Sequence, residues 1–101
     1  MPASRQLHKA LLLLDRGDPG RGERLLRDAV TGAEREGDVV TLVTALCCLG
    51  ELLIERGRTD DAGAVLRAGL AVRVDDEHED LCAPDRRRAR QLLVDIATRA
   101  S

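Results

Sequence analysis

The chain contains no phenylalanine, tyrosine or tryptophan among its 101 residues, and Lys9 is its one lysine. The core must therefore be aliphatic, and no aromatic ring is present on which unpaired bases could stack. Three cysteines, two of them adjacent, do not fit a secreted disulfide framework, so we expect a reducing, cytoplasmic location. The apolar runs are too short for a membrane span or a signal peptide.

Charge of neither sign dominates the sequence. The formal net charge is −2, so no overall basic field would attract nucleic acid or an anionic membrane. Hydrophobic residues make up 44% and charged residues 34%, a balance typical of a globular chain. Leucine and alanine, both good helix formers, supply most of the apolar residues. These proportions predict a single all-α domain over residues 1–101.

Glycine, aspartate and proline residues divide the chain into about five helical stretches. Three of the glycines each follow an apolar helical stripe, as expected where a helix ends in the left-handed conformation. Ser, Thr and Asp residues favour the position just before a helix. The predicted helix stops are Gly17, Gly37 and Gly57, and the predicted caps are Asp18, Asp38 and Thr59.

Connections of two to four residues force neighbouring helices antiparallel, so the first four helices form two tandem hairpins. We predict hairpins over residues 3–37 and 39–74, an acidic loop over 75–83, and a capping helix over 84–100 that Pro84 opens. Gly17 and Gly57 occupy equivalent positions 40 residues apart, which indicates an internal repeat.

Residues 43–76 resemble a tetratricopeptide repeat, whose pattern is W-x2-L-G-x2-Y in one helix and A-x3-F in the next. Leucine stands here in place of each aromatic residue. The small residues of the pattern allow two helix backbones to approach closely, and the large ones fill the space around them. The predicted repeat core is Leu46, Leu49, Gly50, Leu53, Ala62 and Leu66.

Residues 4–37 resemble the same repeat in a degenerate form. Leu13, Gly22 and Leu26 align with Leu53, Ala62 and Leu66, whereas Gln6 and Lys9 stand where large apolar residues are expected. The 40-residue spacing exceeds the usual period of about 34, so the second helix should be longer or its loop irregular.

The resemblance implies a protein-interaction scaffold whose first helices line a concave groove. The groove residues it implies are Leu7, Leu11, Leu14 and Asp15 from the first hairpin, and Thr44, Cys47, Glu51, Ile54 and Glu55 from the second. The Lys/Asn/Arg clamp with which chaperone-binding members hold a carboxylate is missing. An apolar or basic helical segment of a partner protein suits such a groove.

No arrangement of residues indicates catalysis, a cofactor or a metal site, so we expect a non-enzymatic protein. Cys47 and Cys48 point about 100° apart on a helix and cannot easily grip one ion, although His78 and Cys82 invite a metal interpretation. Nearby carboxylates should raise the pKa of the Cys82 thiol and make it less reactive. The segment GDPGRG, residues 17–22, lacks the ending of a phosphate loop and predicts a turn.

The run Arg86, Arg87, Arg88 and Arg90 is the sharpest charge feature. It could contact phosphates, but we favour its pairing with the acidic residues 75–80.

Besides the interaction module, three functions stay open: a self-associating homodimer, a regulatory module working with a DNA-binding partner, and a carrier of a small molecule or metal. The sequence does not identify a partner.

Overall fold

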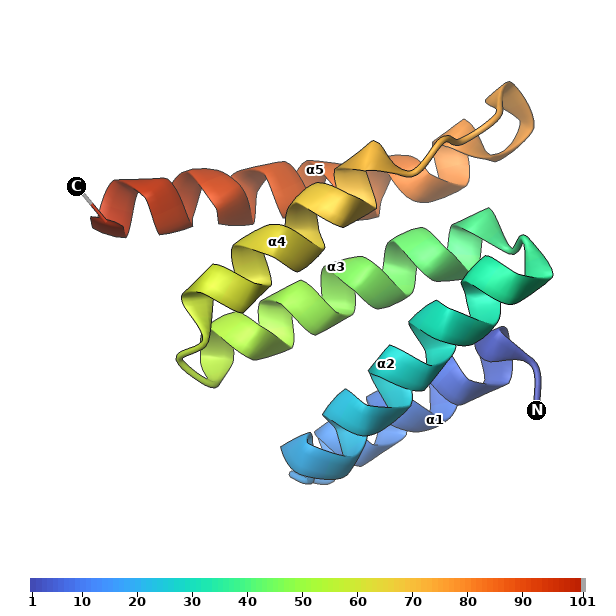
Figure 1. Cartoon of the computed structure of the whole chain (residues 1–101), viewed down its shortest axis with the longest axis horizontal. Helices are drawn as coiled ribbons and strands as arrows, with labels where there is room; N and C mark the ends of the chain where they lie inside the picture. Colours follow the sequence, from blue (N-terminus) through green and yellow to red (C-terminus); the bar gives the residue numbers. More distant parts are fainter. Residues whose placement is uncertain (101) are drawn as a thin grey trace.

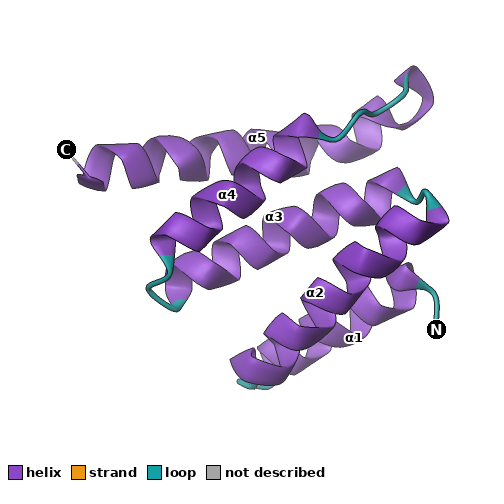
Figure 2. Ribbon diagram, viewed as in Figure 1, coloured by secondary structure: helices purple, strands orange, loops and turns teal. Residues whose placement is uncertain are grey.

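A computed structural model, which describes residues 1–100, consists of five helices joined by short connections (Figures 1 and 2). The described residues contain no strand, which confirms the predicted all-α fold. No helix among them is both long and apolar enough to cross a membrane. The helices are α1 (Ala3–Asp15), α2 (Pro19–Glu36), α3 (Val39–Glu55), α4 (Thr59–Ala71) and α5 (Asp76–Ala100).

The helices alternate between two layers. In Figure 1, α2 and α4 lie in front, and α1, α3 and α5 lie behind them. Each helix packs on the one before it, α5 also packs on α3, and α1 touches α3 along only a short stretch. The predicted pair of hairpins is therefore present, and α2, at 18 residues, is longer than α4, at 13. Because only Gly37 and Asp38 separate α2 from α3, the long spacing comes from the length of α2 and not from an irregular loop.

The same backbone hydrogen bonds form in the turns of both hairpins. The amide of Asp18 donates to the carbonyl of Leu13 at 2.9 Å, and the amide of Arg58 donates to Leu53 at 2.8 Å. Gly17 and Gly57 stand between them with φ of 79° and 77°, a conformation that favours glycine. The 40-residue repeat predicted from these glycines is therefore a repeat of local geometry.

The repeat core predicted in the second hairpin is buried. Leu53, Ala62 and Leu66 are fully inaccessible to solvent, and Leu46 and Leu49 nearly so. Gly50 lies so close to α4 that a Cβ atom there would stand 2.5 Å from Cγ of Leu66. Close approach at this glycine is therefore what allows the two helices to pack at their observed separation.

Two of the three predicted helix caps are confirmed. Asp18 accepts a hydrogen bond from the amide of Arg21, and Asp38 accepts one from Thr41. The prediction for Thr59 is wrong, because Thr59 is the first residue of α4 and Arg58 precedes it without a side-chain cap. Asp60 and Asp61 in the first turn still suit the positive end of the helix.

The prediction of an acidic loop over residues 75–83 followed by a helix opening at Pro84 is also wrong. Helix α5 begins at Asp76 and contains Pro84 in its interior. Acidic side chains in a first turn are favourable, so the charges that indicated a loop instead support a helix start. Asp80 and Pro84 are both exposed, so water can bind the carbonyl that proline leaves without a donor.

Candidate protein-interaction cleft

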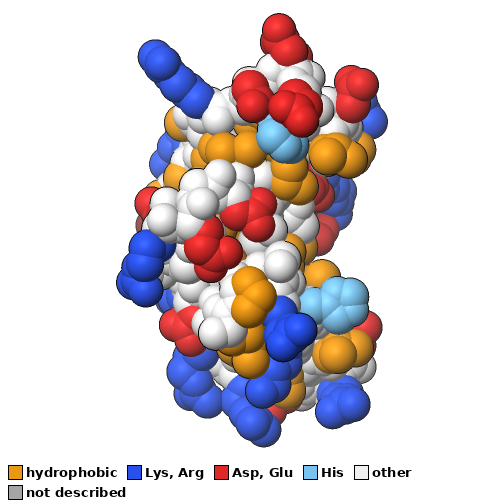
Figure 3. All heavy atoms as spheres, turned by 90° about the vertical axis from the view of Figure 1, so that its right-hand side faces the viewer, with side chains coloured by type: hydrophobic (Ala, Val, Ile, Leu, Met, Phe, Trp, Pro, Cys, Tyr) orange, Lys and Arg blue, Asp and Glu red, His pale blue; other side chains and the backbone are white. Residues whose placement is uncertain are grey.

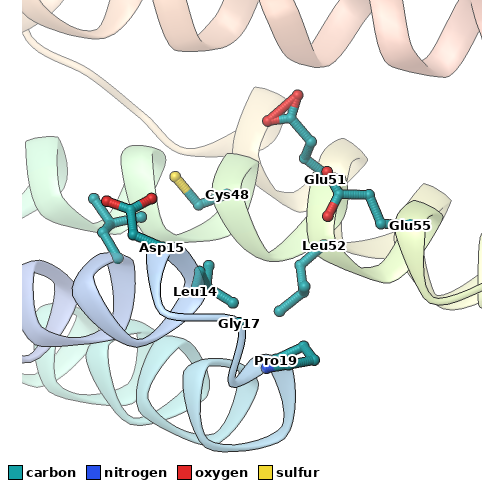
Figure 4. A pocket seen from close by; sticks show the side chains of 9 residues that line it. Leu14, Asp15, Gly17, Pro19, Cys48, Glu51, Leu52 and Glu55 are labelled. Atoms are coloured by element: carbon teal, nitrogen blue, oxygen red, sulfur yellow. The ribbon is translucent and has the colours of Figure 1, made fainter.

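An open cleft of about 440 Å³ lies between α1 and α3 and is closed at one end by the α1–α2 turn (Figure 4). Leucine side chains from both helices form its apolar part, and the Cys48 side chain projects into it from α3. The residues that line the cleft are Leu11, Leu14, Asp15, Gly17, Pro19, Cys48, Glu51, Leu52 and Glu55.

Three carboxylates stand around this apolar surface. Asp15 is the last residue of α1 and Glu55 the last of α3, so each lies at the negative end of a helix, where an anion is unfavourable. Neither makes an ion pair with any of residues 1–100. Glu51 is held by Arg88 of α5, whose Nε and Nη2 donate to it at 3.1 and 2.8 Å. The cleft therefore presents two uncompensated negative charges.

The structure brings together about half of the groove residues predicted from the sequence. Leu11, Leu14, Glu51 and Glu55 line the cleft together with Asp15, and Leu11 is 37% exposed. The other predicted residues, Leu7, Thr44, Cys47 and Ile54, do not line it.

The four predicted residues that lie outside the cleft make contacts elsewhere. The hydroxyl of Thr44 donates to the carboxylate of Asp85 at 2.7 Å, and the thiol of Cys47 donates to the Asp85 carbonyl at 3.4 Å. Both are therefore covered by α5, whose path over α3 the sequence did not reveal. Leu7 and Ile54 are partly buried and pack against the core.

The sequence interpretation missed Cys48 and Leu52, which stand one helical position from the predicted Cys47 and Glu51. Successive side chains of a helix point about 100° apart. Because α5 covers the side of α3 that carries Cys47, the side that stays open carries the next residue, Cys48. The apolar stripe of α3 is almost continuous and could not indicate which part stays open. Gly17 and Pro19 were predicted as turn residues, and their place in the cleft follows from that turn.

All three thiols have raised pKa values. Burial, reinforced by the charge of Asp85, raises the pKa of Cys47 to about 12 and that of Cys48 to about 11. Burial also raises the pKa of Cys82, followed by the effect of Asp85, in the direction predicted from the sequence. Cys47 and Cys82 belong to one core cluster, whereas Cys48 faces the cleft. Among residues 1–100, none of the three thiols joins His78 in a group able to share a metal ion.

We expect the native thiols to react with a disulfide reagent at pH 8 on the order of a hundredfold more slowly than a cysteine of ordinary pKa. The slow native reaction should be at Cys48, because the other two thiols are buried. Its rate should rise with pH towards the pKa of about 11. Reaction of the native Cys48→Ser variant at the wild-type rate would contradict this assignment. In urea, all thiols of both proteins should become accessible and react.

The arginine run does not pair with the acidic segment in the predicted way. Arg88 binds Glu51, and Arg86 donates from Nη2 to the carbonyl of Leu70 at 2.9 Å, so both fasten α5 to preceding helices. Acidic side chains gather instead at the start of α5, near the top of Figure 3. There His78 hydrogen-bonds Asp75. This bond raises the pKa of His78 and lowers that of Asp75.

The Asp75, Glu77 and His78 side chains are close enough to share an ion, but they are solvent-accessible. Exposed acidic groups commonly gather at a helix start without a metal, because the helix dipole stabilises negative charge there. We therefore assign this cluster to the stability of the first turn of α5.

Comparison with models of protein families, with characterised proteins and with solved structures finds no match for the chain.

Proposed function

We propose that the chain is a small cytoplasmic protein-interaction module of the tetratricopeptide type, with no catalytic role. Support comes from the two hairpins, whose turns and small core residues repeat at 40-residue spacing. Stacked helical hairpins expose one continuous face across their first helices, and the cleft lies on that face.

The observation that carries the proposal is the combination of an apolar surface with unpaired carboxylates in one cleft. Leu11, Leu14 and Leu52 offer contacts to apolar side chains, and Asp15 and Glu55 stand beside them without a cation from residues 1–100. Such a lining suits a helical segment with leucine-like and basic residues on one side. The partner is therefore expected to present a basic amphipathic helix.

A designed peptide tests this proposal. A labelled helical peptide with leucine and arginine residues along one side should bind the protein in 50 mM salt. The double variant Asp15→Asn, Glu55→Gln should weaken binding about threefold to tenfold, because it removes two exposed charges whose pairs each contribute about 0.2–1 kcal/mol. Fluorescence anisotropy measures the change.

The matched control is Asp28→Asn, Glu34→Gln, which removes the same charge from exposed positions of α2 outside the cleft. This control should bind the peptide within about twofold of the wild type. Equal loss in both double variants would show that net charge alone attracts the peptide, and absence of binding by the wild type would refute the proposed ligand.

A further inference from the structure

The 40-residue relation between the hairpins extends to α5. Leu26 of α2 shares a core cluster with Leu49 and Leu52 of α3. Forty residues on, Leu66 of α4 shares a cluster with Ala89 and Leu92 of α5. Helix α5 thus stands on α4 as α3 stands on α2, in the position of the first helix of a third hairpin.

The same relation identifies the side of α5 that a second helix of a hairpin would cover. On α1 this side includes the buried Ala3 and Ala10, against which α2 packs through Gly32 and Gly22. On α3 the equivalent positions are Val43 and Gly50, and Gly50 faces Leu66 of α4.

On α5 the equivalent positions are Ala83 and Arg90. Ala83 is only half-buried and Arg90 is exposed, and no later helix among residues 1–100 covers them. The side that α2 covers on α1, and that α4 covers on α3, is therefore uncovered on α5.

This uncovered side of α5 is basic. A cavity of about 280 Å³ there is lined by Ala83, Arg86, Arg87, Arg90 and one acidic residue, Glu79. Arg87 and Arg90 make no ion pair with any of the described residues, while Arg86 is fixed to the Leu70 carbonyl. Guanidinium groups bind carboxylates through paired hydrogen bonds, so two of the three are free to receive an acidic group.

We propose that this side of α5 docks an acidic helical segment of a partner protein, at a site separate from the cleft. The occupant is a helix because the equivalent sides of α1 and α3 each hold one. It is acidic because Arg86 and Arg90 stand where α3 has Leu46 and Gly50. The small side chain of Ala83 lets the incoming helix approach closely.

A labelled alanine-based helical peptide, with glutamates spaced four residues apart, is the probe. It should bind the full chain in 50 mM salt, and Arg87→Gln, Arg90→Gln should weaken binding at least tenfold. The control Arg24→Gln, Arg35→Gln removes the same charge from exposed positions on α2 and should change binding less than twofold. A glutamine version of the peptide should not bind.

Several outcomes would overturn the proposal. These are failure of the glutamate peptide to bind, equal loss in the two double variants, and equal binding of the glutamine peptide. Displacement of the peptide by inorganic phosphate at low millimolar concentration would identify a small-anion site instead. A wild-type dimer in light scattering that Arg90→Gln dissociates would make a second copy of this chain the occupant.

Discussion

The Gly50→Leu substitution should unfold the chain or lower its melting temperature by about 10 °C or more. A Cβ at position 50 would already stand 2.5 Å from both Cγ and Cδ2 of Leu66. Leu66 is fully buried in the core and cannot move aside into solvent. Overpacking of this kind costs about 1–3 kcal/mol, occasionally more, and each kcal/mol shifts the melting temperature of a domain this size by about 4–8 °C.

Gly20→Leu is the matched control for this prediction. Gly20 lies in α2 with no atom within 4 Å of the position that a Cβ would take. The control should melt close to the wild type or slightly higher, because leucine favours the helix more than glycine does. If Gly50→Leu melted within about two degrees of Gly20→Leu, the close packing of α3 on α4 would be refuted.

Glu23→Gln should lower the free energy of unfolding by about 1–3 kcal/mol, because hydrogen bonds to a charged group are lost from a largely buried site. Glu23 accepts bonds from Arg27 at 3.2 Å, from Arg56 at 3.2 Å and from Arg58 at 2.9 and 3.0 Å. One carboxylate thus ties α2 to the turn between α3 and α4. The arginines are each partly exposed, and water reduces the cost of leaving them unpaired.

The effect of Glu23→Gln should depend on pH. Burial acts to raise the pKa of Glu23, but hydrogen bonds from Arg27 and Arg58 outweigh it and hold the pKa below its ordinary value. Its stabilisation is therefore complete above the unfolded pKa of about 4.3 and is lost as pH falls through the lower folded pKa. Urea unfolding at pH 7 should separate the wild type from Glu23→Gln, and the two should converge in acid.

The exposed Glu34→Gln variant serves as control and should match the wild type at both pH values. A difference between wild type and Glu23→Gln that stayed constant down to the acid limit would mean that the Glu23 charge contributes nothing to stability.

Local signals predicted most of the fold. Gly17, Gly37 and Gly57 require positive φ, and Asp18 and Asp38 bond to amides within their own turns, so each position carries its own sequence signature. The start of α5 was missed because an acidic run is compatible with both a solvated loop and a first helical turn. In sequence, Pro84 is typical of the first turn of a helix, but only tertiary contacts decide whether a helix continues past it.

The cleft could be predicted only in part because it depends on how helices dock. Glu51 and Glu55 lie four residues apart on one side of α3, which periodicity reveals. Cys47 and Cys48 are indistinguishable by composition, and the position of α5 decides which one is buried. The Glu23 network was missed for the same reason, although Glu23 and Arg27 have the spacing of a helical ion pair.

The most direct test of the proposed interaction cleft is to titrate the leucine–arginine peptide into 15N-labelled protein and follow the amide resonances. We expect little change on the outer sides of α2 and α4. The largest shifts should occur at the cleft residues Leu11, Leu14, Asp15, Cys48, Glu51, Leu52 and Glu55. Saturable binding whose largest shifts lie elsewhere, or the absence of shifts at peptide concentrations up to the millimolar range, would contradict this prediction.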